Sequence, residues 1–194
     1  QGWEEPPLIT SVTPQIKDIV VQKQPGIDAE MSLFAAWNMM QDTKVDTLCI
    51  TDEDKHLEGL IAVKDVANAN MDIFDTAMLS EAQTSYKNII ETLNGTLLLG
   101  DPNGRVTKGN VRVGTTPEMM EDTIKAGDIV LVTNRYETQQ FAVECDAGCL
   151  VICCGANVSK RVIASAERHG CTIITTPYDT FAAARLIGMS VPVR

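Results

Sequence analysis

The chain is short of basic side chains, of histidine and of long apolar runs. It has 16 lysines and arginines against 26 aspartates and glutamates, which gives a net charge of −10. This balance argues against nucleic acid or an anionic membrane as the main partner, because both require a basic surface. Apolar runs such as residues 149–154 are too short to span a bilayer. The start of the chain carries no basic signal region, and we interpret residues 1–13 as a linker or a cloning remnant.

The motifs that mark common catalytic centres are also missing. The sequence has no HExxH, no GxSxG and no GxxxxGK[ST] pattern, so zinc-hydrolase, serine-hydrolase and phosphate-loop chemistry have no support. The two histidines, His56 and His169, are expected at a hairpin turn and at a helix end, both exposed to solvent. We therefore predict no catalytic residue and no metal ligand in this chain.

The six cysteines include no CxxC pair. A zinc site requires ligands that converge on one point, whereas Cys153 and Cys154 are neighbours on a predicted strand and should point to opposite faces. We favour buried thiols in a reducing compartment over a metal or disulfide role, which places the protein in the cytoplasm.

Residues 14–75 predict a small α+β module. Ser32 is a suitable N-cap for a helix, because apolar side chains follow it at helical spacing: Leu33, Ala36, Trp37 and Met40. Strands at residues 46–51 and 56–63 flank an acidic turn and predict an antiparallel hairpin. A short helix follows from Lys64, and a weakly alternating strand is expected over residues 18–24.

Residues 76–194 predict an α/β domain that begins with a helix near Tyr86. Four strands, each followed by a helix, are expected at residues 111–114, 128–133, 149–154 and 171–175. This alternation predicts parallel strands joined by right-handed crossovers. The fold class is therefore α/β: a small α+β module followed by an α/β domain with a mainly parallel sheet.

Polar, turn-forming residues follow three of these strands at their carboxyl ends, where α/β proteins gather functional contacts. They are Asn134, Arg135, Tyr136, Asn157, Thr176, Tyr178 and Asp179. One interpretation is a binding crevice or a subunit interface. The other is helix capping, which accounts for Asp179 but not for Arg135 and Tyr136. Arg135 could clamp a carboxylate or phosphate, and we favour instead an ion pair with Glu137 or Asp179, or a contact with a second subunit.

A second candidate site follows the predicted hairpin. Gly59 lets its strand run close to a neighbour, and Asp65 lies six residues later at a helix N-terminus. A carboxylate there can cap the helix or accept two ribose hydroxyls, and Lys64 can neutralise a phosphate. From the spacing alone, we favour an ordinary cap and a solvated lysine.

These residues carry a family resemblance. The segment 32–71, with Gly59 and Asp65, resembles a CBS motif, although Ala62 replaces the usual Ser or Thr. The segment 128–193 resembles a DRTGG domain, with Asn134, Arg135 and Thr138 in place of its Asp, Arg and Thr. This order of domains is similar to the regulatory insert of CBS-containing family II inorganic pyrophosphatases.

The resemblance implies a regulatory region that is not catalytic by itself and binds AMP, ADP, ATP or a diadenosine polyphosphate between paired CBS motifs. The residues that it assigns to the nucleotide are Lys23, Pro25, Gly26, Ile27, Ala62, Val63, Lys64 and Asp65. It also implies a homodimer, a second CBS motif outside this chain, and catalytic domains that use manganese or cobalt. This chain itself is expected to hold no cofactor.

Three alternatives remain open. The chain could be a structural dimerisation module, with the polar residues after the strands as its interface. It could be the regulatory region of a phosphotransacetylase or of a CBS-bearing transcription regulator. It could also be an enzyme of unrecognised type, which only the cluster of polar strand ends supports. The order of CBS motif before DRTGG domain favours the pyrophosphatase.

Overall fold

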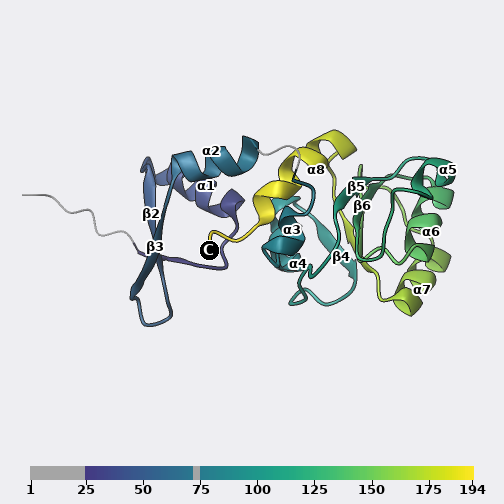
Figure 1. Cartoon of the computed structure of the whole chain (residues 1–194), viewed down its shortest axis with the longest axis horizontal. Coiled ribbons are helices and arrows are strands. Elements are labelled where there is room, and N and C mark those ends of the chain that lie inside the picture. Colours follow the sequence, from purple (N-terminus) through teal and green to yellow (C-terminus); the bar gives the residue numbers. More distant parts are fainter. Residues whose placement is uncertain (1–24, 72–74) are drawn as a thin grey trace, which may run out of the picture.

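A computed structural model describes residues 25–71 and 75–194 of the chain. It forms two modules that lie side by side along the long axis of the molecule, with the C-terminus between them (Figure 1). The predicted strand at residues 18–24 and the nucleotide candidate Lys23 lie outside the described residues.

In the first module the predicted helix, hairpin and second helix follow one another as expected, and a two-residue strand that was not predicted precedes them. It consists of β1 (Ile27–Asp28), α1 (Leu33–Thr43), β2 (Thr47–Thr51), β3 (Leu57–Ala62) and α2 (Val63–Met71). Strand β2 lies in the middle, parallel to β1 and antiparallel to β3, so the predicted hairpin is confirmed. Ser32 caps α1 as expected, because its hydroxyl accepts a hydrogen bond from the Ala35 amide at 3.0 Å.

Three short elements follow the first module along the chain: α3 (Met78–Glu81), α4 (Tyr86–Thr92) and β4 (Thr96–Leu99). Helix α3 lies before Tyr86, in a stretch for which the sequence predicts no helix. A helix of four residues is too short to display an apolar period. The amphipathic pattern does identify α4, which begins after Ser85; the Ser85 side chain accepts a hydrogen bond from the Asn88 amide.

The second module alternates strands and helices as predicted. Its elements are β5 (Val111–Val113), α5 (Pro117–Met120), β6 (Ile129–Val132), α6 (Tyr136–Glu144), β7 (Cys149–Ile152), α7 (Lys160–His169), β8 (Thr172–Thr175), α8 (Thr180–Ile187) and a 3₁₀ turn at Gly188–Ser190. The sheet order is β4-β8-β7-β6-β5. Strands β5 to β8 are parallel and only the edge strand β4 is antiparallel, so the mainly parallel sheet is confirmed.

Helices cover both faces of this sheet. One face packs against α5, α6 and α7 through a core that includes Met120, Val143, Leu150 and Val162. The other face packs against α4 and α8, which lie between the sheet and the first module (Figure 1). Because both faces are covered, every residue of β6 and β7 is buried, as their unbroken apolar sequences predict.

The apolar cores of the two modules are continuous. One cluster of buried side chains joins the first module to the near face of the large sheet: Ile27, Leu48, Ile61, Ile89, Leu93, Ile174 and Ile187. The C-terminal residues also cross between modules, since the Leu33 amide donates to the Val191 carbonyl and the Val193 amide donates to the Met31 carbonyl, both at 2.9 Å. Burial of shared apolar surface therefore holds the modules together.

One detail of the prediction is wrong. Cys153 and Cys154 do not lie on a strand, because β7 ends at Ile152. Cys153 is buried and Cys154 is exposed with a φ of 61°, so the backbone turns at this point instead of continuing the pleat. None of the helices in the described residues is long and apolar enough to cross a membrane.

Candidate functional site

A cavity of about 360 Å³ lies beside Asp65, where the two modules meet. Its apolar walls include Leu33, Ile61, Met78, Val191 and Val193. Its charged lining residues, within the described part of the chain, are Asp65, Glu81 and Arg194. The volume falls in the range of small-molecule sites, and the mixture of apolar walls with a few charges is typical of them.

Asp65 lies in the first turn of α2. Its Oδ2 atom accepts a hydrogen bond from the Ala62 amide at 2.8 Å. Asp65 is therefore the third residue of the helix and bonds back to the residue before the helix, so the prediction of Asp65 as the N-cap residue itself is wrong. Within the described residues its Oδ1 atom makes no hydrogen bond. The residue is exposed and forms part of the cavity lining. The bond to Ala62 therefore uses one carboxylate oxygen of Asp65 and leaves the other open to the cavity.

Arg194 supplies the positive charge of this cavity. Its Nε atom donates to Glu30 Oε1 at 2.6 Å, and its Nη2 atom donates to the Ala82 carbonyl at 2.9 Å. Arg105 Nη1 donates to the other Glu30 oxygen at 2.8 Å. Burial raises the pKa of Glu30, but the hydrogen bonds and charges of Arg105 and Arg194 outweigh this effect and hold that pKa below its usual value.

The other residues expected at the nucleotide do not line this cavity. Ile27 is buried and pairs with Ile50 in the sheet, while Pro25 and Gly26 are exposed beside it. Gly26 allows a close approach, since a Cβ there would meet the Thr51 hydroxyl at 2.2 Å. Lys64 is exposed on α2. The assignment of these four residues to the nucleotide stays a prediction.

Ala62 and Val63 lie where β3 passes into α2, and both are half-buried. Val63 lines a different cavity of about 600 Å³, an apolar one between α1, α2 and α8 that also includes Trp37 and Phe181. The structure thus separates Val63 from the cavity beside Asp65. The role of Ala62 and Val63 at a nucleotide also stays a prediction.

The C-terminal residues of the cavity were missed by the sequence analysis. Val191, Pro192 and Val193 read as an extended segment, because proline favours extended neighbours. Nothing in the sequence indicates that this segment pairs with residues 29–33, which lie about 160 positions earlier in the chain. The valines on either side of Pro192 indicate only that the segment is extended, and they do not identify its partner.

The polar residues at the carboxyl edge of the large sheet do come together. The Cys154 amide donates to the Tyr178 carbonyl at 2.7 Å, and the Gly155 amide donates to the Thr176 carbonyl at 2.9 Å, so the segments after β7 and β8 are joined. Asp179 caps α8 by accepting from the Ala182 amide at 2.7 Å. Asn157 is exposed.

Asn134, Arg135 and Tyr136 follow β6 at the same edge, and all three are exposed. Arg135 forms no ion pair with Glu137 or Asp179 among the described residues, so that expected pairing is not present. Two side chains hold this segment: Thr138, which the DRTGG resemblance includes, donates to the Thr115 carbonyl at 2.7 Å, and Gln139, which the prediction did not include, donates to the Thr133 carbonyl at 2.6 Å.

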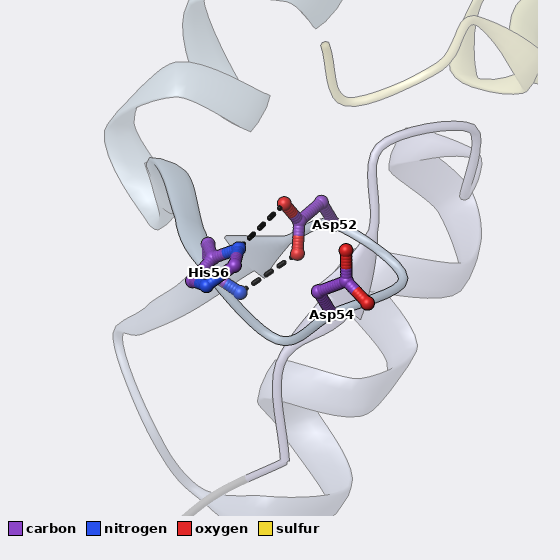
Figure 2. Close-up of side chains that lie close together, drawn as sticks. All are labelled: Asp52, Asp54 and His56. Carbon is purple, nitrogen blue, oxygen red and sulfur yellow. Dashed lines mark hydrogen bonds and ion pairs between the residues drawn. The ribbon is translucent and has the colours of Figure 1, made fainter.

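The turn of the β2–β3 hairpin gathers Asp52, Asp54 and His56, whose potential ligand atoms lie within 4.8 Å of one another (Figure 2). Asp52 accepts hydrogen bonds from the His56 amide at 2.7 Å and pairs with the His56 ring at 3.1 Å. An aspartate that bonds its own turn is a common way to stabilise a hairpin. This contact explains the cluster without an ion, and we assign no metal to it.

Comparisons with known domain families agree with this architecture. The sequence matches the DRTGG domain family over residues 88–190 and the CBS domain family over residues 16–72. The DRTGG match covers the α/β module and α4, and the CBS match covers the first module.

Two curated relatives are pyrophosphatases. The chain is 32% identical over 193 residues to a cobalt-dependent inorganic pyrophosphatase of Clostridium perfringens. It is 20% identical over 193 residues to a probable manganese-dependent inorganic pyrophosphatase of Thermotoga maritima. Each alignment covers 99% of this chain and 35% of the relative, so the chain spans about a third of the length of these proteins.

A solved structure has the same fold over nearly the whole chain. It contains the CBS and DRTGG domains of the regulatory region of the Clostridium perfringens pyrophosphatase, in complex with the activator diadenosine tetraphosphate. The TM-score is 0.85 at 32% identity, and the match covers 92% of this chain and 78% of that one. This chain therefore belongs to the DRTGG-domain family and has the CBS–DRTGG architecture of that pyrophosphatase's regulatory region.

Proposed function

We propose that this chain is a regulatory region that binds an adenine nucleotide in the cavity beside Asp65. The observation that carries the proposal is the lining of that cavity: apolar walls for a base, a carboxylate oxygen for ribose hydroxyls, and the Arg194 guanidinium for phosphate. Asp65 is also the residue that the CBS resemblance assigns to the ribose.

The related structure supports the same function. Its protein is a regulatory region, and its bound activator is diadenosine tetraphosphate, which consists of two adenosines joined by phosphates. A ligand that binds two conformations unequally shifts their populations, and a change in the shared core of the two modules could carry that shift. This proposal includes AMP, ADP and ATP as competing ligands of the same cavity.

We further propose that the parent protein is an inorganic pyrophosphatase whose catalytic domains use manganese or cobalt. The two curated relatives support this assignment. In this proposal the described chain performs no hydrolysis and holds no metal, since its role is to bind the nucleotide and transmit its presence. Sequencing of the gene on both sides of the region that encodes this chain would test the assignment. A phosphotransacetylase domain encoded in the same gene would refute it.

A second CBS motif is proposed to complete the nucleotide site. The outer face of the three-stranded sheet exposes apolar side chains, with Leu57 65% and Leu60 61% accessible and Cys49 exposed beside Leu60. An open apolar sheet face of this kind is a surface that a partner covers. Residues 14–75 would then be one half of a CBS pair, and residues 76–194 the DRTGG domain.

We also propose a homodimer in which the exposed carboxyl edge of the large sheet contributes to the interface. Arg135 and Tyr136 support this, because both are exposed and Arg135 has no ion pair within the described residues. Sedimentation equilibrium of the wild type and of Arg135→Ala tests it. A wild-type chain that is monomeric at micromolar concentration would exclude the homodimer.

The cytoplasm is the proposed location. All six cysteines are free thiols, which suits a reducing compartment, and adenine nucleotides are intracellular ligands.

Isothermal titration of the chain with AMP, ATP and diadenosine tetraphosphate tests nucleotide binding. The matched variants are Asp65→Asn, which keeps an oxygen for the Ala62 amide but removes the carboxylate, and Asp122→Asn, which removes an exposed charge elsewhere. We expect Asp65→Asn to weaken binding about tenfold, the loss for one charged hydrogen-bonding group, and Asp122→Asn to leave it unchanged. Equal affinities of the two variants, or no heat with the folded wild type, would refute the site.

A further inference from the structure

We propose that Glu30 and the phosphates of a bound nucleotide compete for Arg194, so that a charged nucleotide loosens a link between the two modules. This inference rests on the proposed function. Its basis is the double position of Arg194, which lines the cavity beside Asp65 and at the same time is hydrogen-bonded to Glu30.

The cavity gives a phosphate one cation to bind. Among the described residues that line it, Arg194 is the one with a positive charge, while Asp65 and Glu81 are acidic. In this proposal a nucleotide that places its base against the apolar wall and its ribose at Asp65 binds its phosphates at Arg194, the cation in the cavity lining. Phosphate and guanidinium form strong paired hydrogen bonds, so the phosphate is an effective competitor for the group that Glu30 now holds.

Glu30 lies at the junction of the modules. It follows β1 in the first module, and its carboxylate accepts from Arg105 of the second module and from Arg194 at the C-terminus. The Glu30 carbonyl accepts a further bond from Asn88 of α4 at 2.9 Å. Loss of the Arg194 contact would thus weaken one of three ties that Glu30 makes across this junction.

The strength of the contact suits a reversible change. The side chains of Glu30 and Arg194 are 43% and 39% exposed, so water screens their attraction. The backbone pairs of residues 191–194 with residues 29–33 do not involve the guanidinium and can remain. Adenosine, which has no phosphate, would occupy the cavity without disturbing Glu30, whereas ATP would displace it.

The test compares ATP with adenosine on the whole chain by isothermal titration. The variant is Glu30→Gln, and its control is Glu91→Gln, which removes an exposed acidic charge on α4 that makes no ion pair in the described part of the chain. We expect Glu30→Gln to bind ATP about fivefold more tightly, the worth of one released surface ion pair, with adenosine affinity unchanged. We expect Arg194→Gln to weaken ATP binding and leave adenosine binding as it is.

The outcomes separate this proposal from the proposed function. A wild type that binds neither ligand refutes the function and the competition together. If the wild type binds both ligands, and Glu30→Gln and Glu91→Gln have the same affinity for ATP, the competition alone is refuted. Carbon-13 titration of Glu30 in the unaltered chain gives a second measurement: ATP should raise its pKa toward the usual value and adenosine should not, and no difference between the ligands would overturn the proposal.

Discussion

The hydroxyl of Thr176 donates a hydrogen bond of 2.6 Å to the carbonyl of Leu93, although 83 positions separate the two residues. Leu93 is the C-cap residue of α4 and Thr176 follows β8, so this bond ties α4 to the carboxyl edge of the large sheet. The Thr176 oxygen also accepts from the Tyr178 amide at 3.2 Å. The side chain is 1% exposed, which excludes water as a substitute partner.

Thr176→Val should therefore destabilise the fold although it keeps the side-chain shape. The Leu93 carbonyl and the Tyr178 amide would both lose a partner, and a buried unpaired polar group costs about 1–3 kcal/mol. Urea unfolding followed by circular dichroism measures the change. Thr175→Val is the control, because its hydroxyl makes only a 3.5 Å contact and is exposed, and it should cost under about 0.5 kcal/mol. Equal losses for the two variants would contradict the role of Thr176.

Asp128→Asn should have a larger effect. The Asp128 side chain is fully buried and accepts from the Asn110 and Lys125 amides, both at 2.8 Å, with Arg112 Nε 3.8 Å away. An asparagine would turn an NH₂ group toward one of these N–H donors and remove the charge beside Arg112. We expect a loss of about 3 kcal/mol in unfolding free energy.

The control for this change is Asp101→Asn. Asp101 is exposed and accepts one amide hydrogen bond, from Asn103 at 2.9 Å. Thermal unfolding of both variants should show a clear drop for Asp128→Asn and less than about 1 kcal/mol for Asp101→Asn. If Asp128→Asn unfolds at the wild-type temperature, the buried carboxylate does not stabilise the loops at Asn110 and Lys125.

Gly109→Ala tests a close backbone contact. Gly109 has a φ of 97°, and a Cβ there would lie 2.3 Å from the Gly127 carbonyl oxygen, which is backbone and cannot rotate away. Gly170 also has a positive φ, 69°, but a Cβ would meet no atom within 4 Å. Gly170→Ala should therefore cost about 1 kcal/mol from conformation alone, and Gly109→Ala at least about 3 kcal/mol. Guanidinium unfolding curves compare the two, and similar midpoints would show that the loop at Gly109 simply shifts.

The chain should lose stability at alkaline pH. Burial, as the main cause, raises the pKa of Cys171 from 9.0 to about 12 and that of Tyr86 from 10.0 to about 12. Because the folded state holds these groups neutral, their stabilising effect is complete below about pH 9 and is lost as the pH rises toward 12. Unfolding midpoints in urea measured from pH 8 to pH 11 should fall steadily. Cys171→Ala should flatten part of this slope, and an unchanged slope would contradict the assignment.

Much of the fold could be predicted because local patterns encode it. The spacing of Leu33, Ala36 and Met40 predicts α1, and the unbroken apolar residues of β6 and β7 predict strands covered on both faces. The N-caps Ser32 and Asp179 could be identified from the residues that follow them, and both are present in the structure. These interactions span only a few residues, so the sequence contains both partners side by side.

The candidate site was predictable only in part. Asp65 could be identified, since its position at a helix start is a local feature, and the hydrogen bond with Ala62 follows from it. The contact of Arg194 with Glu30 could not, because the partners are 164 positions apart and neither has a local pattern. The prediction of an ion pair for Arg135 was wrong for the same reason, because side-chain pairing at the edge of a sheet depends on how three loops lie in space.

By itself the sequence determined most of the longer elements, their order, the two-module architecture and the acidic composition, because each follows from residue type and from spacing over a few turns. Tertiary structure alone decided that residues 191–194 return to the first module, that one core runs through both modules, and that Asp65 and Arg194 share a cavity. These features depend on contacts between segments far apart in the chain. Such contacts form when distant apolar surfaces are buried together, and no local pattern specifies which surfaces will meet.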